Sequence, residues 1–203
     1  MSAEAAAREA AAKDKARQYL ALRGTRATVG QLRERIDAGL AALEAFLDSV
    51  PAALVTRRAW PDEWSLAEIA DHLLETHRPT LDELRCLLAG VRPPRGPIPA
   101  GLQSVAPLTR PWPWLLRDLG RCHGDIREAL AAVPADFATE ARAPLVMVAN
   151  VEGGPPLEWI EELDWKAYVI VIRLHALDHL NQAKKVAAAL GVDVSRAAAA
   201  GAP

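Results

Sequence analysis

The sequence has little cysteine, no long apolar stretch and almost no excess of charge of either sign. Its two cysteines, Cys86 and Cys122, are not spaced as a metal-binding pair, which indicates a reduced, cytoplasmic protein. The formal net charge is −2 and basic residues form no block, which argues against nucleic acid as a partner. No segment approaches the roughly 20 consecutive apolar residues of a membrane span, and the first residues lack the pattern of a secretion signal. What remains is an ordinary globular composition, 51% hydrophobic over 203 residues, which suits one domain with a substantial core.

The chain is predicted to contain one domain, residues 25–192, flanked by two segments outside its core. Residues 1–24 are rich in alanine and carry charges at helical spacing, as in Glu9-Ala-Ala-Ala-Lys13. We therefore expect an appended helix there that buries little surface. Residues 193–203 are mostly alanine and are expected to be a disordered tail.

Four longer segments carry apolar residues at the spacing of an amphipathic helix. The first begins at a capping box formed by Thr28 and Gln31, and the second at a similar box formed by Ser65 and Glu68. Pro79 falls inside the second segment and is expected to kink or break the helix. The predicted helices span residues 28–50, 65–88, 114–133 and 157–190. We therefore predict an all-α fold, a four-helix bundle with long crossover connections and an extra N-terminal helix.

The two long connections, residues 93–113 and 134–156, carry further expectations. The apolar run 145–149 is allowed as a short strand, with Gly153-Gly154 as its turn. The first connection is rich in proline and glycine and could cover a pocket together with Trp112 and Trp114, or these residues could simply pack. Both cysteines are expected to be small buried residues on the second and third helices.

Five histidines are the main candidates for chemistry. His175 and His179 lie four residues apart on the inward face of the last helix, a spacing that lets two imidazoles hold one metal ion. The alternative is a pair of buried histidines satisfied by hydrogen bonds. A third ligand must come from a facing helix, where periodicity favours His77 over His72 as the more buried residue. His123 is expected at the surface or at a pocket edge.

Two motifs resemble the DinB-like (DinB/YfiT) superfamily of small helical metalloenzymes. One is Trp64-Ser65-Leu66-Ala67-Glu68-Ile69-Ala70-Asp71-His72-Leu73, and the other is His175-Ala176-Leu177-Asp178-His179-Leu180-Asn181-Gln182, preceded by Trp159. The resemblance implies a four-helix bundle with up-down-down-up connectivity, frequently dimeric. It also implies a three-histidine metal site on His72, His175 and His179, in place of the choice that periodicity favours.

A three-histidine site leaves at least one coordination position open, which is typical of catalytic rather than structural metals. Zinc, nickel and iron all accept such ligands. The ion could activate water, giving a hydrolase, or a low-molecular-weight thiol, giving a transferase or isomerase that acts on a small-molecule substrate. We expect Glu68, Gln182 and His77 to lie behind the ligands and orient them, although Glu68 is better explained by its capping box. The alternatives are a non-catalytic metal-binding or stress-response protein, and an interaction module with structural histidines.

Overall fold

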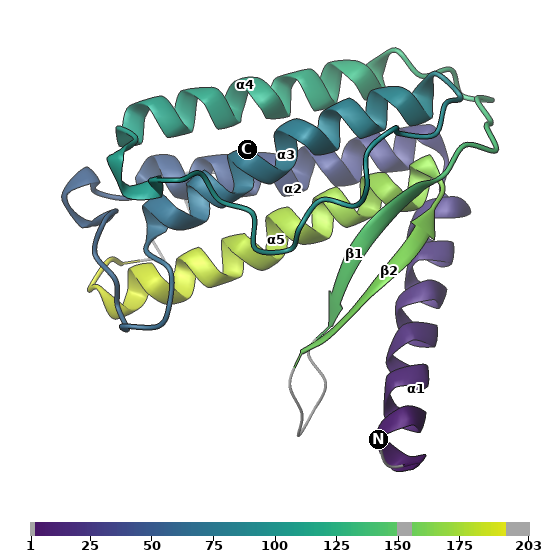
Figure 1. Ribbon diagram of the computed structural model, residues 1–203. Helices are drawn as coiled ribbons and strands as arrows, with labels where there is room; N and C mark the ends of the chain where they lie inside the picture. The colour runs from purple at the N-terminus through teal and green to yellow at the C-terminus, as the bar shows by residue number, and fades with distance from the viewer. Residues whose placement is uncertain (1–2, 150–155, 194–203) are drawn as a thin grey trace.

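The computed structural model describes residues 3–149 and 156–193, and within these ranges the chain is mostly helical (Figure 1). A two-stranded antiparallel sheet separates the fourth and fifth helices. The α-helices and β-strands of these residues are α1 (Ala3–Leu20), α2 (Val29–Ser49), α3 (Leu66–Leu88), α4 (Trp112–Ala131), β1 (Ala143–Ala149), β2 (Leu157–Leu163) and α5 (Trp165–Ala189). Among the described residues, no helix combines the length and apolarity that crossing a bilayer requires.

The sheet corrects the all-α prediction. The apolar run 145–149 is a strand, as allowed, but residues 157–163 also form a strand instead of the first two turns of the last helix. Along β2 every second residue is exposed, and the strand pairs with β1 from Ala143–Leu163 to Ala149–Leu157. The helix begins only at Trp165, after the N-cap residue Asp164, whose side chain accepts hydrogen bonds from the backbone N–H groups of Lys166 and Ala167. The predicted turn Gly153-Gly154 lies outside the described residues.

The predicted capping boxes set the start of two helices. Thr28 Oγ1 accepts from Gln31 N at 3.2 Å, and the Gln31 side chain accepts in return from Thr28 N at 3.1 Å. The same exchange joins Ser65 and Glu68 at the start of α3. Pro79 lies within α3, but the helix continues through it to Leu88. The helix is therefore not broken at Pro79, and a kink there stays a prediction.

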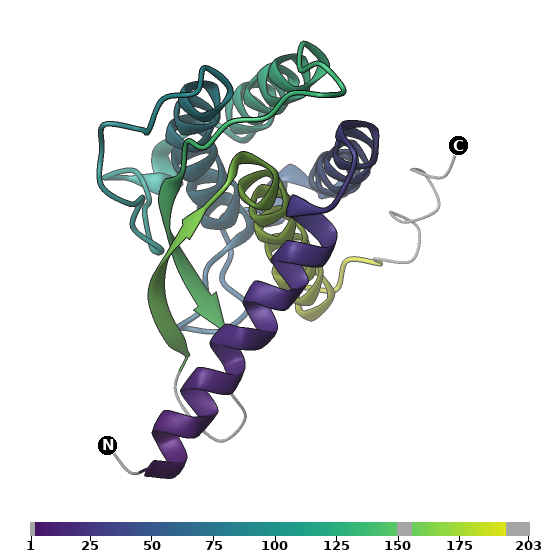
Figure 2. The ribbon, with the colours of Figure 1, turned by 90° about the vertical axis from the view of Figure 1, so that its right-hand side faces the viewer.

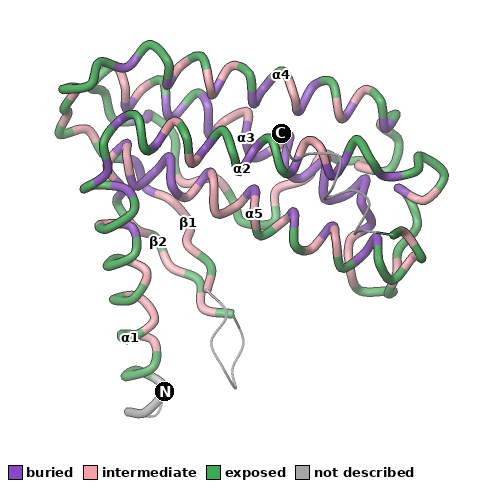
Figure 3. Tube along the Cα trace, turned by 180° about the vertical axis from the view of Figure 1, so that it is seen from behind, coloured by how far each residue is buried: buried purple, intermediate pink, exposed green. Residues whose placement is uncertain are grey.

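The long helices α2, α3, α4 and α5 pack side by side around one core (Figure 3). Helices α2 and α3 each contact both α4 and α5. Figure 1 shows α2 and α5 running in one direction and α3 and α4 in the other, so residues 89–111 return along the length of the helices. The predicted stripe of α2 is confirmed, since each member is at most 1% exposed: Leu32, Ile36, Leu40, Leu43 and Leu47.

Helix α1 projects from this core and runs beside the sheet (Figure 2). Among its described side chains only Leu20 is buried, as expected for an alanine-rich helix with little to bury. Arg17 donates to both carboxylate oxygens of Glu161 on β2, at 3.0 and 3.1 Å. The contact is an exposed ion pair, which contributes little to stability. The appended helix therefore lies against the sheet rather than in the core.

Candidate metal centre

Three histidines from two helices, one buried and two partly buried, converge at one point between α3 and α5. His72 comes from α3, and His175 and His179 come from successive turns of α5. One ligand atom from each lies within 4.8 Å of the others, and the Nε2 atoms of His72 and His175 are 3.0 Å apart. The ring centroids of His175 and His179 are 4.6 Å apart. The spacing of four residues therefore places both α5 rings on one face, opposite the α3 ring.

The remaining ring nitrogen of each histidine has a partner. His72 Nδ1 donates to the carbonyl oxygen of Leu102 at 2.7 Å. His179 Nδ1 donates to Gln182 Oε1 at 2.8 Å. Because both acceptors are oxygens, Nδ1 carries the proton in each ring and Nε2 carries the lone pair. Hydrogen bonds of this kind orient metal-binding histidines and fix their tautomer.

His77 lies behind the centre rather than in it. It is 1% exposed, as the helical periodicity predicted, but His72 is equally buried at 1%. The Nε2 atom of His77 lies 3.1 Å from His175 Nδ1, and its Nδ1 atom lies 2.9 Å from His123 Nε2. His77 therefore contacts His175 on the side away from His72.

His123 is fully buried, so its predicted place at the surface or a pocket edge is wrong. Its Nδ1 atom lies 2.7 Å from Glu44 Oε1 on α2. Both residues were missed as members of the network, yet the helical spacing could have found His123. It lies four residues after Leu119 and three before Ile126, both buried on α4. Glu44 gives no such signal, because a carboxylate beside an apolar stripe is usually solvated.

Burial keeps all of these histidines neutral at neutral pH. Burial lowers the pKa of His77 and of His175 well below the usual range, and the neighbouring histidines lower it further. Burial also lowers the pKa of His72 and of His123. For His179 burial lowers the pKa to about 4. Neutral imidazole is the form that binds a metal ion.

Glu68 forms the predicted capping box and lies away from the rings. Its carboxylate accepts from Ser65 N at 2.8 Å and from Ser65 Oγ at 2.7 Å. Arg58 also donates to it, at 3.1 Å through Nε. Its backbone oxygen accepts from Gln103 Nε2 at 3.1 Å. Glu68 therefore holds the start of α3, whereas Gln182 contacts His179 and His77 contacts His175.

The loop between α3 and α4 is fastened beside His72. Asp71, which is 0% exposed, accepts from Ser104 N and Ser104 Oγ, both at 2.8 Å. Arg110 Nη1 donates to the same carboxylate at 2.8 Å. Leu102, two residues before Ser104, provides the carbonyl that His72 contacts. The loop therefore supplies part of the metal centre's framework.

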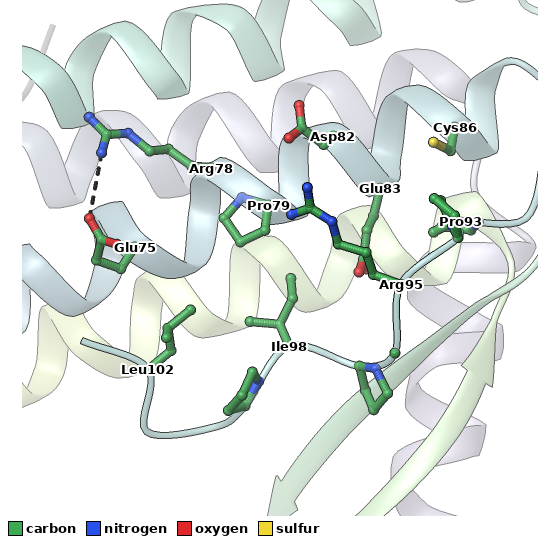
Figure 4. A pocket seen from close by; sticks show the side chains of 14 residues that line it. Glu75, Arg78, Pro79, Asp82, Glu83, Cys86, Pro93, Arg95, Ile98 and Leu102 are labelled. Atoms are coloured by element: carbon green, nitrogen blue, oxygen red, sulfur yellow. Dashed lines mark hydrogen bonds and ion pairs between the residues drawn. The ribbon is translucent and has the colours of Figure 1, made fainter. Parts of the chain in front are cut away.

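A pocket of about 540 Å³ lies between α3 and this loop (Figure 4). Its lining includes Leu102 but none of the three converging histidines. Cys86 is half-buried on its wall, whereas Cys122 is buried as predicted, and burial raises the pKa of the Cys122 thiol to about 11. Five charged residues line the pocket beside its prolines and apolar side chains: Glu75, Arg78, Asp82, Glu83 and Arg95.

Replacing Glu83 with glutamine should stabilise the protein at pH 7. Glu83 is 5% exposed and accepts a 2.6 Å hydrogen bond from Tyr168 Oη. Burial raises its pKa, although the Tyr168 hydrogen bond and Arg95 oppose the shift. A raised folded-state pKa means that the stability contributed by Glu83 is complete below the unfolded pKa of about 4.3 and is lost as pH rises through the folded value. Glu83→Gln should therefore gain on the order of 1 kcal/mol over the native chain between pH 4 and pH 7.

Urea unfolding at the two pH values measures this difference. The control is Asp82→Asn, which removes a carboxylate whose side chain is 70% exposed and should change stability by less than about 0.5 kcal/mol. A Glu83→Gln variant whose advantage does not grow with pH would contradict the prediction.

The donor set fits a divalent metal ion. Three neutral imidazoles, two with Nε2 fixed as the acceptor, surround a point in the core, and nitrogen ligands of this kind suit transition metals. A family model described as the DinB superfamily matches residues 35–183, more than half of the chain and all three histidines. No curated protein and no solved structure gives a significant match to the chain.

Proposed function

Since the chain belongs to the DinB superfamily, we propose that it is a metal-dependent enzyme whose ion is held by His72, His175 and His179. The observation that carries the proposal is the 3.0 Å separation of two Nε2 atoms, those of His72 and His175. With Nδ1 of His72 donating to a carbonyl, its Nε2 has a lone pair directed at the second ring. A cation between the rings turns this close approach of acceptors into coordination.

The residues around the rings have separate tasks. The Leu102 carbonyl and the Gln182 amide hold two of the imidazoles in the tautomer that presents Nε2. A divalent ion held by three imidazoles would supply Lewis acidity and lower the pKa of a water or a small thiol in the open position. Zinc, nickel and iron all accept this donor set. Hydrolysis and thiol transfer to a small molecule are the reactions that follow, and no general acid is assigned.

We also propose that the four long helices form one bundle. The opposite directions of α2 and α5 relative to α3 and α4 support an up-down-down-up four-helix bundle (Figure 1). Such a bundle places a metal site between facing helices, here α3 and α5. We also infer a homodimer and a cytoplasmic location.

A non-catalytic metal-binding protein is the second candidate, and Trp64 favours it. The Trp64 ring lies 4.9 Å from the His72 ring and stacks on the His179 ring at 6.1 Å, measured between centroids. An indole so close to two ligands limits the room for a substrate. Metal-loaded protein that turns over neither ester, amide nor thiol-transfer substrates would favour this candidate.

Elemental analysis of untagged protein tests the metal site. The native chain, reconstituted separately with zinc, nickel and iron, should retain about one equivalent, and His179→Ala should retain little. Lys185→Ala, an exposed change on the same helix, is the control and should match the native chain. Metal absent from all three proteins after reconstitution would refute the metalloenzyme proposal.

A further inference from the structure

A chain of side-chain contacts runs from the metal centre to the surface and takes one residue from each long helix. His175 of α5 contacts His77 of α3 at 3.1 Å, and His77 contacts His123 of α4 at 2.9 Å. His123 contacts Glu44 of α2 at 2.7 Å. The two middle histidines are at most 1% exposed, whereas the Glu44 side chain is 27% exposed. Two buried rings, those of His123 and His77, therefore connect the partly exposed carboxylate of Glu44 to the candidate ligand His175.

The carboxylate gives the chain a direction. Arg127 donates to both oxygens of Glu44, at 3.1 and 3.0 Å. Burial opposes the charge of Glu44, but hydrogen bonds from His123 and Arg127 outweigh burial and hold its pKa below the usual range. An ionised carboxylate can only accept, so His123 Nδ1 must donate to it.

The direction of hydrogen-bond donation at His123 fixes the direction at the next ring, because each neutral imidazole has one donor nitrogen and one acceptor nitrogen. With Nδ1 donating to Glu44, His123 accepts at Nε2 from His77 Nδ1. His77 then accepts at Nε2 from His175 Nδ1. The proton of His175 is thereby placed on Nδ1, and its Nε2 lone pair faces His72.

The opposite direction would close the metal centre. If His175 accepted at Nδ1, its proton would lie on Nε2, 3.0 Å from His72 Nε2. The two rings would then form a hydrogen bond with each other, and neither lone pair would be free for a metal ion. Neutral histidines alone could donate along the series in either direction. The ionised carboxylate of Glu44 selects one of the two directions.

We propose that Glu44, through His123 and His77, is a positioning residue that fixes the tautomer of His175 and so keeps the metal centre open for a cation. The negative charge of Glu44 at the end of this series of contacts also makes the Nε2 atom of His175 a more basic ligand for a metal ion. The effect on metal affinity rests on the proposed function, whereas the effect on the tautomer does not.

The test compares Glu44→Gln with Asp37→Asn. Glutamine keeps the size of Glu44 but removes the charge and adds a donor, so the chain no longer has one fixed direction. Asp37 is a matched control, because it lies on the same helix and accepts from Arg127 Nε at 2.7 Å, without contacting the histidines. Both residues are partly exposed, which favours folded variants.

Nitrogen-15 NMR of the histidine rings in metal-free protein gives the first readout. Native protein and Asp37→Asn should have His175 protonated at Nδ1, and Glu44→Gln should show a mixture of tautomers. A native His175 protonated at Nε2 would overturn the proposal without any variant. An unchanged tautomer in Glu44→Gln would overturn it as well.

Zinc affinity, measured by competition with a chelator, gives the second readout. Glu44→Gln should bind zinc about 10- to 100-fold more weakly than native protein, and Asp37→Asn should stay within about twofold. Equal affinity in all three proteins would refute the positioning role but leave the metal site intact. A native protein that binds neither zinc, nickel nor iron would refute the proposed function, and the tautomer measurement would still decide the role of Glu44.

Discussion

Zinc added to the metal-free protein should raise its free energy of unfolding by about 4 kcal/mol at a free concentration 1,000 times the Kd. The candidate ligands His72, His175 and His179 come together only in the folded chain, since the first lies about a hundred residues from the others. Binding to the folded state therefore stabilises it by mass action. Zinc also removes the cost of directing ring lone pairs at one another in the core, where an unpaired polar atom is expensive.

Urea unfolding at fixed pH, with and without zinc, measures this effect. His179→Ala should lose most of the increase, because it retains two of the three ligands. His175 and His179 stay four residues apart in the unfolded chain and can bind zinc weakly there. Such binding reduces the increase in the free energy of unfolding. An identical increase in native protein and His179→Ala would place the bound zinc elsewhere and contradict the assignment.

The helices that could be predicted are those whose signals are local. The capping box of Thr28 and Gln31 involves residues three apart, and the α2 stripe repeats within each turn. Strand β2 was missed although its partner β1 ends at Ala149, only eight residues before β2 begins, because the apolar residues of β2 do not identify one period. Leu157, Ile160 and Leu163 also fit a helical spacing, so the segment matches both periods until the pairing is known.

The choice between His72 and His77 shows a second limit of periodicity. Helix α3 contacts both α4 and α5, so it is buried over much of its circumference. Its buried residues accordingly include polar ones such as Glu68, Asp71 and Thr76. Hydrophobic spacing locates one inward face, and it favoured His77 although both histidines are buried. The family motif selected His72, and the structure places that ring among the converging three.

Replacing Asp71 with alanine should cost about 2–4 kcal/mol of stability and also weaken zinc binding. The Asp71 carboxylate is fully buried and accepts from Ser104 N, Ser104 Oγ and Arg110. Its loss leaves Ser104 N and Ser104 Oγ without their acceptor, while Arg110 keeps its bond to Glu75, and it releases the loop two residues from Leu102. His72 Nδ1 then loses a fixed acceptor, so the tautomer that presents Nε2 is no longer enforced.

The matched control is Asp118→Ala, which removes another buried carboxylate from a position that does not hold the loop. The Asp118 side chain is 5% exposed and accepts from Arg78 at 2.7 Å. Both variants should unfold at lower urea concentrations than native protein. Only Asp71→Ala should also weaken zinc binding, by about tenfold in chelator competition. An equal loss of affinity in both variants would reflect general destabilisation, and the loop would then have no separate part in holding His72. A selective loss would mean that a proline- and glycine-rich connection, and not the helices alone, sets the geometry of the metal centre.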